Sequence, residues 1–177
     1  VLLQSCTNGS SEMITNLANA ATTFLFNYTL LQFYGENGVA SITIILYFQY
    51  IFTALYFGYA NGIAPILSYK FGNDDKMQLK CIFKNSILFL IISSIVANIL
   101  MHIFLTRALT IFTVANSDVY NITLHGFNIY SLAFTIMGLG IFSSSMFTAF
   151  SDGKTSAIIS FSRTFIFIIG AILILPK

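Results

Sequence analysis

The sequence of 177 residues is 56% hydrophobic and only 8% charged, with a formal net charge of +2 and a mean hydropathy of +0.83. Soluble domains carry about 25% charged residues, and a soluble protein this apolar would expose large apolar patches. The composition therefore predicts an integral membrane protein. It excludes a nucleic-acid-binding surface, because the eight Lys and Arg residues are spread along the chain and form no basic patch.

Five long runs with almost no charged residues follow one another along the chain. About 20 helical residues cross the hydrocarbon core of a bilayer, and each run reaches that length. We expect spans at approximately residues 10–35, 37–69, 77–106, 119–151 and 155–176. The predicted fold is an all-α, polytopic helix bundle in a membrane. The chain begins without Met and stops just after an apolar run, so we expect residues 1–177 to be a fragment of a longer protein.

The connections between the predicted spans alternate in charge. The second connection carries four lysines between Lys70 and Lys84, and the fourth carries Lys154. The first has no basic residue and the third has only Arg107. Because basic residues concentrate on the cytoplasmic side, we expect the second and fourth connections inside and the first and third outside.

Two of these connections share a pattern of helix-stop residues. The segment 71–76 reads Phe-Gly-Asn-Asp-Asp-Lys, with Gly72 placed to end one helix and Asp74 or Asp75 placed to cap the next. The segment 150–155 reads Phe-Ser-Asp-Gly-Lys-Thr and follows another long run. The similarity is consistent with a repeated helix-pair unit.

The end of the second run carries residues that favour close packing and bending. Gly58 and Gly62 have the GxxxG spacing that lets a second helix approach closely. Pro65 lacks a backbone donor and clashes with the preceding turn, so we expect a bend or break there. Broken helices at membrane depth occur where they face protein or a water-filled cavity, so this segment favours a cavity.

A polar stripe follows one face of the first run. At 100° per residue its members fall within about 80° of arc, and they are Glu12, Asn16, Asn19, Thr23 and Asn27. One interpretation is a cavity wall that faces substrate or ions, and the other is hydrogen bonding between helices. Glu12 is either an ion-coupling carboxylate or an interfacial residue in a first helical turn.

Further polar candidates occur in later runs. Gln49, Thr53 and Tyr56 share a face of the second run, and we add them to the predicted substrate or ion cavity. The cluster Ser143–Ser145 in the fourth run favours either close helix packing or binding. We expect no enzymatic activity, because the sequence lacks the motifs of common hydrolases and nucleotide-binding enzymes. Cys6 and Cys81 have no metal-ligand spacing, so we expect no metal site and no cofactor other than a coupling ion.

Several segments resemble the C-terminal half of the multidrug and toxic compound extrusion (MATE) transporters. They are Gly35–Ala40 (GENGVA), Gly58–Gly72 (GYANGIAPILSYKFG), Asn8–Met13 (NGSSEM), Phe147–Ala157 (FTAFSDGKTSA) and Ser160–Thr164 (SFSRT). The resemblance covers essentially the whole chain. It implies two six-helix lobes with a cavity between them, of which this chain supplies five helices of one lobe and lacks the N-terminal lobe of the same protein.

The resemblance also implies a function. We expect a secondary active transporter in the cell membrane, a multidrug efflux antiporter that exports organic cations or amphiphiles by alternating access. The coupling ion would be Na⁺ or H⁺, and the partners would be a small-molecule substrate and membrane lipid. Gly58, Gly62 and Pro65 would permit bending of the helix. Two alternatives stay open: a flippase-like exporter of lipid-linked or peptide cargo, and a membrane scaffold that transports nothing.

Overall fold

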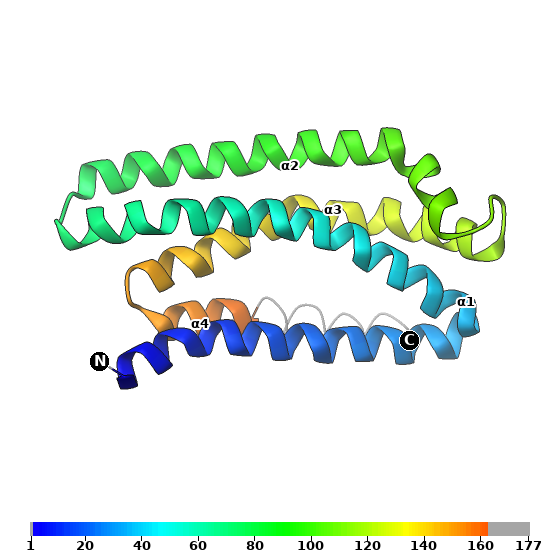
Figure 1. The fold of residues 1–177 in the computed structure, drawn as a ribbon, viewed down its shortest axis with the longest axis horizontal. Helices are drawn as coiled ribbons and strands as arrows, with labels where there is room; N and C mark the ends of the chain where they lie inside the picture. Colours follow the sequence, from blue (N-terminus) through cyan, green and yellow to red (C-terminus); the bar gives the residue numbers. More distant parts are fainter. Residues whose placement is uncertain (1, 163–177) are drawn as a thin grey trace.

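The computed structural model describes residues 2–162, with side chains described at residue 13 and from residue 16 onward. The helices in this range are α1 (Leu2–Gly72), α2 (Lys76–Phe112), α3 (Asp118–Ala149) and α4 (Gly153–Phe161). Figure 1 shows that α1 folds back on itself at one end of the bundle, and that α2, α3 and α4 then run alternately back and forth along the same long axis. The predicted all-α helix bundle is confirmed.

The reversal inside α1 occurs at Gly35. Its φ of 61° and ψ of −151° lie in a region that essentially only glycine adopts, and it is the non-helical position within α1. Three residues later, a Cβ on Gly38 would lie 2.9 Å from the Leu30 carbonyl oxygen and 2.6 Å from the Tyr34 Cβ. Because the two halves of α1 approach this closely, both glycines are required for the turn. The uncharged runs on either side of Glu36 become two antiparallel helices, residues 2–34 and 36–72.

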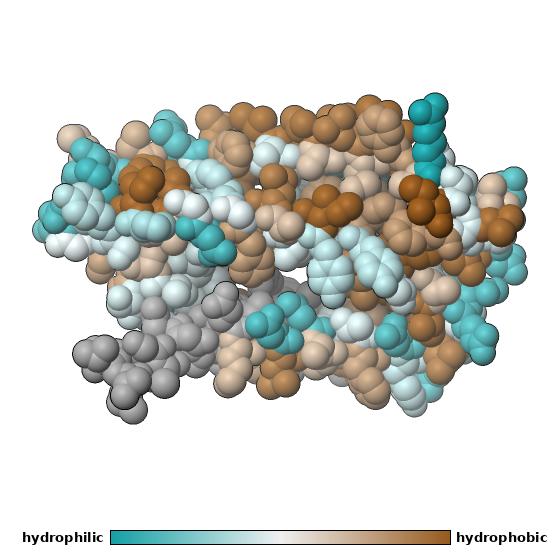
Figure 2. All heavy atoms as spheres, viewed as in Figure 1, coloured by the Kyte–Doolittle hydropathy of each residue, from teal (hydrophilic) through white to brown (hydrophobic). Residues whose placement is uncertain are grey.

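Three described helical stretches are long and apolar enough to cross a membrane: Asn16–Gly72, which contains the reversal at Gly35, Lys76–Phe112 and Asp118–Ala149. Large apolar side chains cover the outside of α2, including Ile95, Ile99 and Ile103, and they are about half exposed. Figure 2 shows hydrophobic atoms gathered along the middle of α2, at the upper edge of the view, with hydrophilic residues toward its ends. This surface suits contact with lipid. Five separate spans stay a prediction, because the part of the chain after residue 162 lies outside the described residues.

Both predicted helix stops form turns of the same geometry. In each, a residue with positive φ donates its amide to the carbonyl three residues earlier, and the following Asp donates its amide to the carbonyl five residues earlier. The first turn pairs Asp74 with Phe71 and Asp75 with Lys70; the second pairs Ser151 with Thr148 and Asp152 with Phe147. The Asp side chain then caps the next helix. Among the two candidates in the first turn, Asp75 is the cap.

The two turns lie at the same end of the bundle. The rings of Phe71 and Phe150 stack there with centroids 4.5 Å apart. The reversal at Gly35 and the connection between α2 and α3 lie at the opposite end (Figure 1). The alternation of connections predicted from the lysines therefore has a matching geometry in the bundle.

The core joins the second half of α1 to α3. Phe52, Tyr56, Phe127 and Phe134 are almost fully buried there. Tyr56 donates its hydroxyl to the Phe134 carbonyl oxygen at 2.9 Å, and its ring lies where a Cβ on Gly138 would sit, 2.8 Å away. The close approach of α1 and α3 therefore depends on the missing side chain of Gly138.

The end of α1 is an unbroken helix in the described structure, and close packing on the GxxxG pair and a bend at Pro65 stay predictions. No described atom lies within 4 Å of a Cβ built on Gly58 or Gly62, so no described helix packs closely on the GxxxG pair. The helical dihedral angles also continue through Pro65 as far as Gly72, so the helix is not broken there. The break in α1 lies at Gly35, where the backbone conformation itself excludes other residues.

Candidate functional site

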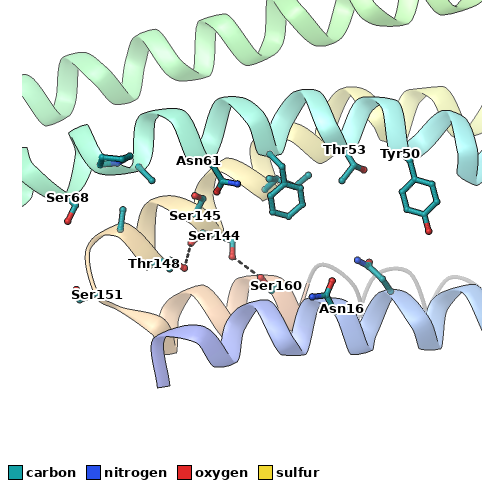
Figure 3. Close-up of a pocket in the computed structure, with 16 residues that line it drawn as sticks. Asn16, Tyr50, Thr53, Asn61, Ser68, Ser144, Ser145, Thr148, Ser151 and Ser160 are labelled. Atoms are coloured by element: carbon teal, nitrogen blue, oxygen red, sulfur yellow. Dashed lines mark hydrogen bonds between the residues drawn. The ribbon is translucent and has the colours of Figure 1, made fainter. Parts of the chain in front are cut away.

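A cavity of about 600 Å³ lies between the two halves of α1 and the helices α3 and α4. This volume falls within the range of about 300–1,000 Å³ that is usual for small-molecule sites. Figure 3 shows the polar side chains that face the space from opposite sides. The lining residues are Asn16, Asn19, Tyr50, Thr53, Phe57, Asn61, Ala64, Pro65, Ser68, Ile141, Ser144, Ser145, Thr148, Ala149, Ser151 and Ser160.

One face of the second half of α1 forms the upper wall of the cavity in Figure 3. Its residues recur at intervals of three and four, as a single helical face requires: Tyr50, Thr53, Phe57, Asn61, Ala64 and Ser68, with Pro65 beside them. Asn61 and Ser68 are exposed to this space. The wall therefore offers an amide and hydroxyls next to the aromatic rings of Tyr50 and Phe57.

Hydroxyl groups from α3 and α4 form the opposite part of the lining. The Ser144 Oγ lies 2.8 Å from the Ser156 Oγ and 2.8 Å from the Ser160 Oγ, and the Thr148 Oγ1 lies 2.8 Å from the Ser156 Oγ. Ser156 also donates to the Ser144 carbonyl oxygen at 2.8 Å. This network joins the two helices. Ser144 therefore fits both interpretations of the serine cluster, close helix packing and binding, because it joins α3 to α4 and also lines the cavity.

The predicted polar stripe divides along the first half of α1. Asn16 and Asn19 line the cavity. Thr23 instead donates its hydroxyl to the Asn19 carbonyl oxygen at 2.9 Å. The Asn27 Oδ1 is buried and has no hydrogen-bond partner among the described residues. Glu12 lies outside the residues whose side chains are described.

The predicted set from the second run divides in the same way. Thr53 lines the cavity, whereas Gln49 and Tyr56 do not. The Gln49 Oε1 accepts a hydrogen bond of 3.2 Å from the Tyr130 hydroxyl, and Tyr56 is buried against α3. The cavity-facing residues Tyr50 and Phe57 each come one position after Gln49 and Tyr56, whereas Thr53 belongs to both sets. The spacing from Tyr50 to Ser68 was the signal that identifies the correct face.

The cavity lining carries no carboxylate and no Lys, Arg or His among the described residues. The charged groups lie instead at the ends of the bundle, where Lys70 pairs with Asp75 at 3.7 Å and Lys76 pairs with Asp74 at 3.5 Å. At the other turn of this end, hydrogen bonds from the Thr155 hydroxyl and amide lower the pKa of Asp152. The cavity can therefore bind ligands through amide oxygens, hydroxyls and aromatic faces, without a fixed charge of its own.

Comparisons with known proteins place the chain in a family. The MatE family model matches residues 12–173, which include α1 from residue 12 onward, α2, α3, α4 and every described residue of the cavity lining. A search of curated proteins and a search of solved structures each returned no match. Three apolar helices of membrane-spanning length accompany the family match. The chain therefore belongs to the MatE family, the membrane transporters of the multidrug and toxic compound extrusion type.

Proposed function

We propose that this chain forms a ligand-binding lobe of a multi-pass secondary transporter in the cell membrane. The transporter would export organic cations or related amphiphiles by alternating access, driven by a gradient of Na⁺ or H⁺. The observation that carries the proposal is the cavity of about 600 Å³, which combines amides, hydroxyls and aromatic rings. The N-terminal lobe expected in the full-length protein would close this cavity from the other side.

The chemistry of the lining suits weakly hydrated organic cations. Aromatic faces such as those of Tyr50 and Phe57 attract cations, by roughly 0.5–2 kcal/mol each depending on solvation. The amide oxygens of Asn16, Asn19 and Asn61 can accept hydrogen bonds from ammonium or amide groups. Because no fixed charge sets a single orientation, the same lining can take ligands of different shapes.

The alternatives fit the cavity less well. An exporter of anionic lipid-linked cargo would need basic side chains in the cavity, and the described lining has none. A scaffold that transports nothing would seal its polar groups between helices, whereas Asn16, Asn19 and Asn61 are exposed to open space.

The proposal is tested by efflux of ethidium from proteoliposomes that contain the full-length protein, under an imposed Na⁺ or H⁺ gradient. Asn61→Leu should slow efflux, because it removes a polar group from the centre of the wall. Asn85→Leu is the matched control, since Asn85 is an exposed amide on α2 outside the cavity. If Asn61→Leu, Asn16→Leu and Asn19→Leu combined in well-folded protein leave efflux unchanged, the cavity is not the substrate site.

A further inference from the structure

A second hollow, separate from the cavity, lies between the second half of α1 and α2. It has a volume of about 370 Å³ and shares no lining residue with the cavity. Every lining residue is apolar: Ile51, Phe52, Leu55, Ala97, Leu100, Met101 and Phe104. Ile51 is 58% exposed and Phe104 is 53% exposed, so the hollow is a groove open to the outside of the described bundle.

The part of the groove that α2 forms lies within one half of the predicted span. The uncharged run of α2 from Asn85 to Thr106 has 22 residues, which is about 33 Å of helix and close to the thickness of about 30 Å of the hydrocarbon core. The groove residues on α2, from Ala97 to Phe104, occupy the part of this run that ends at Arg107. The groove therefore extends along α2 from near the middle of the span, where Ile51 and Leu55 of α1 line it, toward the headgroups beside Arg107.

Arg107 stands at the headgroup end of the groove. It follows Leu100 by seven residues and Phe104 by three, so it lies on nearly the same face of α2 as these two groove residues. Its side chain is exposed. The ion pairs among the described side chains join Lys70 with Asp75 and Lys76 with Asp74, so Arg107 has no ion-pair partner in the described part of the chain.

We propose that the groove and Arg107 form a binding site for an anionic phospholipid. One acyl chain would fill the apolar groove, and the phosphate would accept hydrogen bonds from the Arg107 guanidinium. The planar guanidinium suits this role because it binds phosphate through two parallel hydrogen bonds. An anionic lipid is favoured over a zwitterionic one, because no ammonium group in its headgroup offsets the attraction to Arg107. The lipid site shares no lining residue with the cavity, so the test of lipid binding does not depend on the proposed transport function.

The test places a reporter in the groove of the full-length protein. Residues 1–177 contain no tryptophan, so Phe104→Trp introduces a single fluorophore into this part of the protein. Fluorescence from the rest of the full-length protein is removed by subtracting the signal of the parent protein. The protein is reconstituted in nanodiscs of equal parts phosphatidylglycerol and phosphatidylcholine, with bromine on the acyl chains of one lipid or the other. We expect stronger quenching by brominated phosphatidylglycerol, reflecting about fivefold enrichment at the site, the factor that one basic residue near a membrane surface contributes.

Two variants separate the parts of the site. Arg107→Gln should remove the preference for phosphatidylglycerol, whereas Lys84→Gln, which changes the basic residue near the other end of the same helix, should keep it. Ala97→Phe, which fills the groove, should also remove the preference while Arg107 is intact. Ile99→Phe adds similar bulk outside the groove lining and should have no effect.

Three results would overturn the proposal. Equal quenching by the two brominated lipids at Trp-substituted position 104 would show that no anionic lipid is enriched. Retention of the preference in Arg107→Gln would exclude the guanidinium as the phosphate ligand. Retention of the preference in Ala97→Phe would show that Arg107 attracts anionic headgroups without an acyl chain bound in the groove. Size-exclusion profiles that match the parent protein confirm that each variant is folded.

Discussion

The contact between Gly138 and Tyr56 makes a sharp prediction for Gly138→Ala. A Cβ at position 138 would lie 2.8 Å from the Tyr56 Cδ1 and Cε1 and 3.1 Å from its Cγ. These atoms belong to a rigid ring that is fully buried and held by the hydrogen bond to Phe134. The ring cannot turn away from the new methyl group, so α1 and α3 must move apart.

The cost can be estimated from two opposing effects. Overpacking of a tight core costs about 1–3 kcal/mol, and contact with three ring atoms at once favours the upper part of that range. Replacing a helical glycine by alanine recovers at most about 0.8–1.0 kcal/mol. We therefore expect Gly138→Ala to destabilise the protein by about 1–2 kcal/mol.

Gly62→Ala is the matched control. It makes the same substitution within a helix, but no described atom lies within 4 Å of the new Cβ. Thermal unfolding of the full-length protein in detergent should give a lower midpoint for Gly138→Ala and an unchanged or higher midpoint for Gly62→Ala. Adding Tyr56→Leu to Gly138→Ala should recover part of the loss, which a double-mutant cycle measures. Equal midpoints for the two alanine variants would refute the packing argument.

Two further predictions concern Tyr56 and Asp152. Tyr56→Phe removes the buried hydrogen bond to the Phe134 carbonyl and should lower stability by about 0.6–1.5 kcal/mol, but it should leave ethidium efflux unchanged because Tyr56 does not line the cavity. The pKa of Asp152 is lowered from 3.8 by hydrogen bonds from Thr155. The Asp152 carboxylate therefore stabilises the fold fully at pH values above 3.8, its ordinary pKa. This stabilisation is lost as the pH falls through the lower pKa that Asp152 has in the folded protein. In Asp152→Asn, the thermal midpoint should lack the decrease at acid pH that protonation of Asp152 causes in the parent protein. Identical dependence of the midpoint on pH in the parent and the variant would contradict the capping role.

The local features of the fold were predictable because they depend on neighbouring residues alone. α1 ends at Gly72 as predicted, but the positive φ of the two turns falls on Asp74 and Ser151 and not on a glycine, and Asp75 and Asp152 cap the next helices. The uncharged runs predicted helices, and the single charge at Glu36 marked the reversal beside Gly35. These signals act within one or two turns of chain, so tertiary packing does not override them.

The cavity was only partly predictable, because its boundary depends on which helix faces pack together. Asn16 and Thr23 share one stripe, but Asn16 faces the cavity and Thr23 bonds to the backbone of its own helix. Gln49 and Tyr56 sit about 100° from the cavity-facing residues that follow them, and that face packs on α3. A polar stripe limits the possible orientations of a helix, and the neighbours decide which edge of the stripe remains open.

The absence of charge from the described cavity lining has a consequence for ion coupling. A group that exchanges protons during transport must titrate near the working pH, as carboxylates and histidines in proteins can. The described lining contains neither a carboxylate nor a histidine, so it can supply oxygen ligands to Na⁺ but holds none of the groups that usually exchange protons in transporters. We therefore expect Tyr50→Phe to leave the pH profile of efflux unchanged, even where it changes the apparent affinity for ethidium. A shifted profile would place proton coupling in the cavity itself. An unchanged profile directs the search to carboxylates elsewhere in the protein, and within this chain to Glu12, one helical turn before Asn16.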